Sequence, residues 1–169
     1  MFKIYLAGYM SKDKLKETVE WRLKVRNHYR MKSWEDVKFL DPYNGKKFAE
    51  ISGDGLKSDV PPQALVHRDY QCVINSDLIV ANMNTFGCSR PSTGTTCELA
   101  WAWEHQKPII IITEDNNYKE HPFLKYFTSW FVKDVDELLD KKCIDYFYKG
   151  SADAQYTEKE LFKALKEND

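Results

Sequence analysis

Four consecutive isoleucines, residues 109–112, follow Pro108 and form the longest run of β-branched aliphatic residues in the sequence. The run is far shorter than the ~20 apolar residues of a membrane-spanning helix, and its length is typical of a buried β-strand. β-Branched residues without polar alternation indicate a strand that is covered on both faces, as in parallel sheets flanked by helices. The sequence therefore predicts a parallel sheet inside an α/β domain.

Strand-like and helix-like segments alternate along the chain. Strands are expected at residues 2–7, 37–40, 77–81, 108–113 and 130–132, and helices at 14–31, 62–75, 95–104, near 123, at 135–139 and at 158–165. In the first helix, Leu15, Val19 and Leu23 recur on one face, which we expect to be buried. Such alternation favours parallel strands joined by right-handed crossovers.

We therefore predict an α/β fold of the flavodoxin-like or Rossmann-like type. It should be doubly wound, with a mostly parallel five-stranded sheet and helices on both faces. Residues 1–169 are expected to form one domain, in which residues 145–169 contribute a peripheral helix and residues 44–62 a long loop.

Charge and cysteine spacing narrow the classes of function. Lys and Arg number 25 against 26 Asp and Glu, so the chain lacks the positive excess of a protein that binds nucleic-acid polymers. The four cysteines form no C-x-x-C and the four histidines no H-E-x-x-H, so no metal and no cofactor are predicted. With no signal peptide or membrane span in sight, we expect a cytoplasmic protein with reduced cysteines.

Ligands of doubly wound sheets bind beyond the carboxyl ends of the strands. Three segments with suitable chemistry fall there: a strand that runs from Tyr5 into Gly8, the acidic residue Asp69 ahead of a strand, and a Ser/Thr/Gly-rich loop that leads into the helix of Glu98. Other polar residues at such strand ends are Asp41 and Asn82. The sequence thus predicts a sugar- or phosphate-binding site.

Glu98 is expected in the first helical turn, where unpaired N–H groups and the helix dipole favour a carboxylate. A second carboxylate nearby would complete the equipment for cleaving a glycosidic bond. Structural roles are equally open at this point. Thr95 and Glu98 also fit a capping box, Asp69 a solvated surface acid and Tyr5 a core residue. The tryptophans of this helix, Trp101 and Trp103, are predicted to be packing residues.

Five segments in order resemble the nucleoside 2-deoxyribosyltransferase family. They are residues 3–8 (KIYLAG), 40–42 (LDP), 68–82 (RDYQCVINSDLIVAN), 94–102 (GTTCELAWA) and 107–110 (KPII). The last two are the most specific. The resemblance covers residues 2–139 and implies a flavodoxin-like enzyme that works without a cofactor and assembles as a homodimer or homotetramer.

The resemblance also implies roles for single residues. Glu98 matches the nucleophile that takes the deoxyribosyl group as a covalent ester. Asp69 matches the acidic residue that assists protonation of the departing base and activates the acceptor. Tyr5 matches a tyrosine that orients the nucleophile. Substrate-binding positions are expected at Gly8, Ser92, Gly94, Thr95, Asp41 and Asn82.

Ser92 is the position that bears on the substrate. In the family's transferases an Asp often stands there, whereas relatives that hydrolyse deoxynucleoside 5′-monophosphates have a Ser that contacts the phosphate. A hydroxyl donates to a phosphate that a carboxylate would repel, so Ser92 favours a nucleotide, with Arg90 as a charge partner. The leading hypothesis is transfer of deoxyribose between bases through Glu98. The alternatives are hydrolysis of a 5′-monophosphate by water and a non-catalytic nucleotide-binding module.

Overall fold

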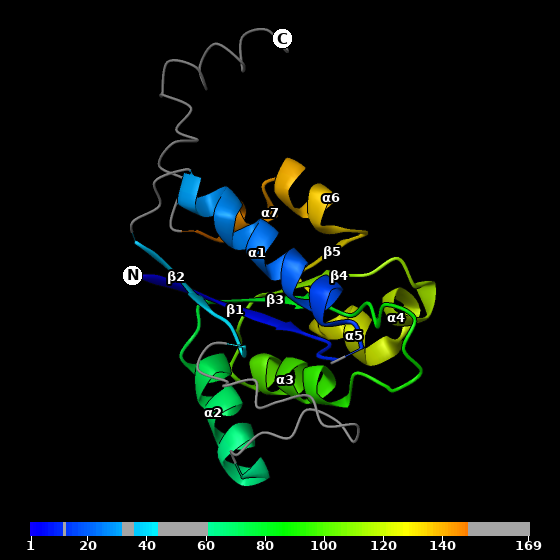
Figure 1. Cartoon of the computed structure of the whole chain (residues 1–169). Coiled ribbons are helices and arrows are strands. Elements are labelled where there is room, and N and C mark those ends of the chain that lie inside the picture. The colour runs from blue at the N-terminus through cyan, green and yellow to red at the C-terminus, as the bar shows by residue number, and fades with distance from the viewer. Residues whose placement is uncertain (12, 32–35, 44–60, 149–169) are drawn as a thin grey trace, which may run out of the picture.

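A five-stranded sheet runs through the middle of the computed structural model, which describes residues 1–11, 13–31, 36–43 and 61–148 (Figure 1). Its strands are β1 (Phe2–Gly8), β2 (Val37–Leu40), β3 (Leu78–Asn82), β4 (Ile109–Ile112) and β5 (Trp130–Val132). The helices are α1 (Leu15–Met31), α2 (Pro62–Ile74), α3 (Thr93–Glu104), α4 (Asn116–Glu120), α5 (Pro122–Phe127), α6 (Val135–Asp140) and α7 (Cys143–Phe147). The predicted 44–62 loop, except for its last two residues, and the predicted 158–165 helix lie outside the described residues.

All four strand pairings are parallel, and the strand order is β2-β1-β3-β4-β5. This is the order of flavodoxin-like doubly wound sheets. The predicted fold class is confirmed. Each of the five expected strands is present within one residue of its predicted ends.

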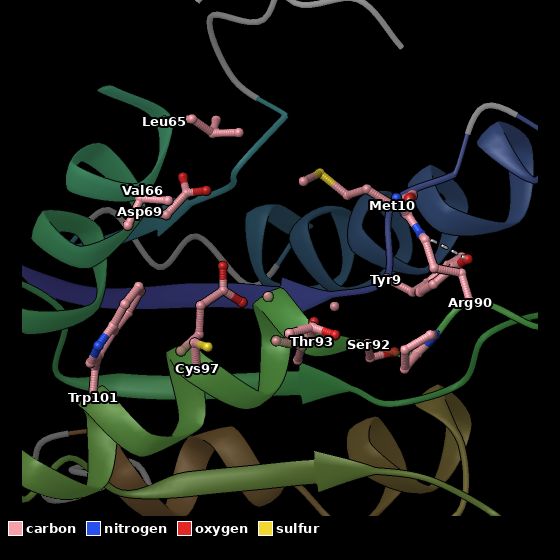
Figure 2. A pocket seen from close by; sticks show the side chains of 15 residues that line it. Tyr9, Met10, Leu65, Val66, Asp69, Arg90, Ser92, Thr93, Cys97 and Trp101 are labelled. Atoms are coloured by element: carbon pink, nitrogen blue, oxygen red, sulfur yellow. Dashed lines mark hydrogen bonds between the residues drawn. The ribbon is translucent and has the colours of Figure 1, made fainter. Parts of the chain in front are cut away.

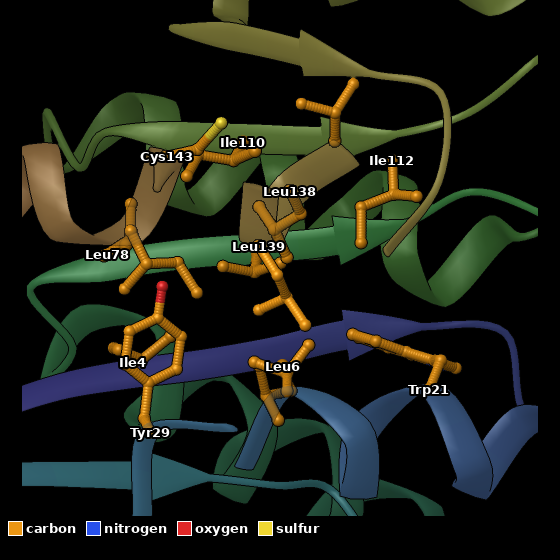
Figure 3. Close-up of a cluster of buried hydrophobic side chains, with 14 of the residues drawn as sticks. Ile4, Leu6, Trp21, Tyr29, Leu78, Ile110, Ile112, Leu138, Leu139 and Cys143 are labelled. Atoms are coloured by element: carbon orange, nitrogen blue, oxygen red, sulfur yellow. The ribbon is translucent and has the colours of Figure 1, made fainter. Parts of the chain in front are cut away.

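Buried side chains alternate between the two faces of the sheet. In β1, Ile4 and Leu6 pack with α1, α6 and α7, whereas Tyr5 and Ala7 pack with α2, α3 and α5. Figure 1 shows these two groups of helices on opposite sides of the sheet, and Figure 3 shows the α1 side of the core. Because both faces are covered, strands such as Ile109–Ile112 are buried along their whole length.

The buried face of α1 differs from the predicted one. Leu23 is 44% exposed, and Leu15 and Val19 are only half-buried, so the expected face was wrong. The residues that α1 buries are Thr18, Trp21, Arg22, Val25 and Tyr29. The spacing of aliphatic residues does not reveal the buried face of α1, because that face includes the polar residues Arg22 and Thr18. Their burial depends on partners outside the helix.

The start of α3 also differs. The helix begins at Thr93, with Ser92 at the N-cap, instead of at the expected residue 95. Thr95 is therefore a residue of the first turn and Glu98 lies in the second turn. The capping-box alternative is wrong, and so is the placement of Glu98 in the first turn. The short helices α4 and α7 were not predicted.

Arg22 is 1% exposed and fastens α1 to the carboxyl end of β1. Its guanidinium donates to the carbonyl oxygens of Leu6 at 3.3 Å, Gly8 at 3.0 Å and Thr18. Its Nε lies 3.7 Å from Oδ1 of Asp41, which follows β2. Burial lowers the pKa of Arg22, and the Asp41 carboxylate opposes this shift. The ends of β1 and β2 and helix α1 therefore meet at one charged group.

Replacement of Arg22 by Met should destabilise the protein by about 3–5 kcal/mol, because it leaves buried carbonyl groups and a buried carboxylate short of donors. The matched control is Arg26→Met. Arg26 contacts the same Asp41 carboxylate at 3.4 Å but is 30% exposed, so its loss should cost about 1 kcal/mol or less. Urea unfolding of both variants measures the difference. Equal losses would contradict the role of Arg22.

Candidate active site

A cleft of about 410 Å³ opens at the carboxyl end of β1. The strand order reverses between β1 and β3, and the helices that follow these two strands, α1 and α3, lie on opposite faces of the sheet (Figure 1). Such a switch point leaves a crevice in which ligands bind. The cleft is lined by Gly8, Tyr9, Met10, Leu65, Val66, Asp69, Arg90, Pro91, Ser92, Thr93, Gly94, Thr95, Cys97, Glu98 and Trp101.

A buried hydrogen bond joins the sheet to Glu98. The hydroxyl of Tyr5, whose side chain leaves β1 toward α3, donates to Oε1 of Glu98 at 2.7 Å. Tyr5 is fully buried and Glu98 is 8% exposed. Burial, and then the negative charges of Glu98 and Asp69, raise the pKa of Tyr5 far above its ordinary value. The phenol therefore keeps its proton and acts as a donor that orients the carboxylate.

Asp69 lines the same cleft from α2 and is equally buried. Arg68 donates to Oδ1 of Asp69 through Nε at 3.1 Å and Nη2 at 2.7 Å, and also to the carbonyl of Pro42 at 3.0 Å. Within the described part of the chain, Oδ2 of Asp69 makes no hydrogen bond. Figure 2 shows the Asp69 carboxylate on the cleft side of α2. The structure thus brings Tyr5, Asp69 and Glu98 together, from three separate segments.

Ser92 and Arg90 form the opposite end of the cleft (Figure 2). Oγ of Ser92 is buried and has no hydrogen-bond partner among the described residues. Arg90 donates to the carbonyl of Met10 at 2.6 Å, and its guanidinium carbon lies 5.1 Å from the centre of the Tyr9 ring. A cation and an unpaired hydroxyl therefore lie within reach of an anionic ligand group. Gly94 and Thr95, also predicted to bind substrate, line the cleft as well.

Gly8 is the last residue of β1 and lines the cleft. A Cβ at this position would lie 3.0 Å from the carbonyl oxygen of Asn82 and 3.1 Å from the Trp21 ring. Its φ of +154° is one that L side chains rarely adopt. No larger residue fits without a shift of the backbone, so the neighbouring strands approach closely only because residue 8 is Gly.

Two of the predicted substrate-binding residues do not line the cleft. Asp41 is turned toward Arg22 and Arg26 and accepts from the backbone N–H of Tyr43 at 2.9 Å. Asn82 is buried, and its Oδ1 accepts from the N–H of Asn84 at 3.0 Å. The structure therefore places both in the framework that holds the loops around the cleft.

Sequence reasoning missed Trp101, which it assigned to packing. Trp101 contacts the core from α3 but also lines the cleft. The signal was available, because Trp101 follows Glu98 by three positions and residues at this spacing share a helix face. Trp103 faces away and is 41% exposed. Leu65 and Val66 of α2 were also missed, since nothing local indicates which side of α2 meets α3.

The described residues contain no group of three or more His, Cys, Asp or Glu side chains placed to hold a metal ion. No helix among them combines the length and the apolar character needed to cross a membrane.

Comparison with solved structures finds the same fold in several proteins. The CMP N-glycosidase BcmB of Clostridium botulinum is 18% identical, with a TM-score of 0.53 over 84% of this chain and 98% of that chain. A conserved protein from Enterococcus faecalis V583 is 18% identical, with a TM-score of 0.58 over 83% of this chain and 96% of that chain. The protein BlsM is 18% identical, with a TM-score of 0.54 over 89% of this chain and 96% of that chain. At this identity the likeness shows the fold alone.

The fold and the paired carboxylates define an α/β protein with a ligand cleft at its topological switch point. The sequence model of the family described as nucleoside 2-deoxyribosyltransferase matches residues 4–165. The chain belongs to this family, whose members act on nucleosides or nucleotides by glycosyl transfer or hydrolysis. The resemblance predicted from the sequence is confirmed. No curated protein sequence matches the chain.

The stability of the protein should fall above pH ~10, in part because of Tyr5. The unfolded chain loses the tyrosine proton near pH ~10, whereas native Tyr5, with its raised pKa, retains it. The native state then binds more protons, so each such group costs ~1.4 kcal/mol of stability per pH unit above that point. Below pH ~10 both states hold the tyrosine proton, so the contribution of Tyr5 to the free energy of unfolding is present in full.

Urea unfolding between pH 9 and 11.5 checks this expectation (a range chosen as roughly one unit around the ordinary tyrosine pKa). Tyr5→Phe should make the loss of stability with pH shallower by about one proton. The control, Tyr126→Phe, removes the hydroxyl of a side chain that is 72% exposed and should leave the slope unchanged. An unaltered slope in Tyr5→Phe would refute the proposed protonation of Tyr5.

Proposed function

We propose that the protein cleaves the N-glycosidic bond of a 2′-deoxynucleoside 5′-monophosphate through a covalent deoxyribosyl–Glu98 intermediate. The observation that carries this proposal is the buried Tyr5–Glu98 hydrogen bond at 2.7 Å, in a cleft that Asp69 also lines. A carboxylate held in one orientation beside a second carboxylate is the arrangement used for double displacement at a sugar carbon. Membership in the family supports the same chemistry.

In the first step a carboxylate oxygen of Glu98 attacks C1′ of the sugar. The C1′–N bond breaks, its electron pair leaves with the base, and the base takes up a proton from solvent that Asp69 helps to deliver. A new C1′–O bond to Glu98 replaces the bond that broke. A 2′-hydroxyl would withdraw electron density from C1′, and a 2′-deoxy sugar lacks this group. The oxocarbenium-like transition state is therefore easier to reach.

In the second step an acceptor attacks C1′ and releases the Glu98 carboxylate. Asp69 takes the proton of the acceptor and passes it to solvent. The family name supports a second base as acceptor, which makes the protein a transferase. Water is the second candidate and makes it a hydrolase. Both acceptors approach from the side that the first base has left.

The proposed preference for a phosphorylated substrate rests on the end of the cleft formed by Arg90 and Ser92. The buried hydroxyl of Ser92 has no hydrogen-bond partner in the part of the chain that the structure describes, and Arg90 lines the same end of the cleft with a positive charge. A 5′-phosphate has the acceptor oxygens that these groups could bind. A neutral nucleoside presents only an uncharged 5′-hydroxyl at this end and has no anion to pair with Arg90, which favours a nucleotide as substrate.

Replacement of Glu98 by Gln should lower turnover by about 10³-fold or more, because an amide cannot act as the nucleophile. Chromatography of deoxynucleoside 5′-monophosphates, incubated with and without adenine, measures release and exchange of the base. Glu104→Gln is the matched control, since Glu104 is an exposed residue of the same helix. Exchange that requires adenine would identify a transferase, and release without it a hydrolase. Equal turnover by Glu98→Gln and the parent would refute the mechanism.

Replacement of Ser92 by Asp should raise the KM for a 5′-monophosphate by about tenfold or more, because the new carboxylate repels the phosphate. The KM for the unphosphorylated nucleoside should change little. Ser89→Asp adds the same charge at an exposed position of the same loop that does not line the cleft, and should leave both values unchanged. Steady-state kinetics on the two substrates give the comparison. A parallel loss on both would assign Ser92 a structural role instead.

A further inference from the structure

The two ends of the cleft differ in chemistry. Leu65 and Val66 of α2 and Trp101 of α3 form an apolar end, and Tyr9, Arg90 and Ser92 form a polar one. Figure 2 shows the two groups at opposite ends, with Cys97 of α3 between them. A ligand with one flat apolar part and one anionic part therefore has a single favourable orientation in the cleft.

Trp101 is held in place at the apolar end. Its ring packs edge-on against Tyr70 of α2, with the ring centres 5.3 Å apart and the planes at 89°. The Tyr70 hydroxyl in turn lies 3.1 Å from Nε2 of His105, just beyond the end of α3. Because the Tyr70 ring already restricts the indole, Trp101 loses little side-chain freedom when a ligand packs against it.

We propose that Trp101 is the platform against which the base of the substrate packs. This inference rests on the proposed function, which requires C1′ of the sugar to lie beside Glu98. The base is bonded to C1′, and Trp101 lies one helical turn from Glu98 on the same helix face. With the phosphate at Arg90 and Ser92, the base is directed to the apolar end.

The platform also determines how the base is recognised. Among the described side chains at this end, only the indole N–H of Trp101 and the carboxylate of Asp69 can form a hydrogen bond with the base. Stacking on an aromatic ring tolerates every base, because each presents a π-face. The protein therefore accepts purines and pyrimidines alike, and its affinity follows the area of the ring.

Binding to a protein that does not turn over tests the platform. In the Glu98→Gln background, calorimetry measures the dissociation constants of dAMP, dCMP and 2-deoxyribose 5-phosphate, which lacks a base. Adding Trp101→Ala should weaken binding of both nucleotides by about tenfold or more and leave the sugar phosphate unchanged. It should also reduce the preference for dAMP over dCMP.

Two further variants separate stacking from folding. Trp101→Phe keeps an aromatic ring and should retain most of the affinity. Trp103→Ala removes an indole from the same helix that faces away from the cleft, where it stacks on Phe127, and should bind like the parent background. An equal loss of affinity for the sugar phosphate in Trp101→Ala, or no loss for the nucleotides, would overturn the proposal.

The binding test of Trp101 and the turnover test of Glu98 can fail independently of each other. Nucleotides that bind through Trp101 but are not cleaved by the parent would support the platform and refute the enzyme mechanism. Cleavage by the parent, with nucleotide binding that is unaffected by Trp101→Ala, would support the mechanism and refute the platform.

Discussion

A single buried guanidinium holds the end of the strand on which the candidate active site is built. Arg22 donates to the carbonyls of Leu6 and Gly8 at the carboxyl end of β1 and pairs with Asp41 beyond the neighbouring strand. A charge at such depth is tolerated only where it is paired and hydrogen-bonded. The two β1 carbonyls, the carbonyl of Thr18 and the Asp41 carboxylate provide those partners. The same group thus anchors α1 to the end of β1, where the cleft opens.

One hydrogen bond joins β1 to the carboxylate of Glu98 in the candidate active site. Tyr5 belongs to the face of β1 opposite Arg22, and its hydroxyl donates to Glu98 of α3. The strand is thereby coupled to α1 on one face and to the carboxylate on the other. Since the sheet is rigid and covered on both faces, the position of Glu98 is set by the core. A carboxylate on a helix packed against a central strand is thereby held in one geometry.

Much of the fold could be predicted because its signals are local. The isoleucine run of β4, the short apolar strands and the breaks between them occur within a few residues each, and all five strands were located. The buried face of α1 could not be predicted, since Arg22 is polar and its burial depends on carbonyls of another element. The start of α3 was misjudged by two residues, because Thr93 and Gly94 are weak helix formers and nothing local marks Ser92 as the cap.

The sequence by itself determined the α/β class, the family and the residues with suitable chemistry, because composition, periodicity and motif spacing are properties of the chain alone. Only the tertiary structure decided which of these residues meet. It brought Asp69 and Glu98 to one cleft, placed the buried Tyr5 hydroxyl against Glu98, turned Asp41 toward Arg22 and put Trp101 in the cleft lining. The reason is geometric: segments far apart in sequence are placed side by side by the strand order and by the choice of face, and both depend on how the whole core packs.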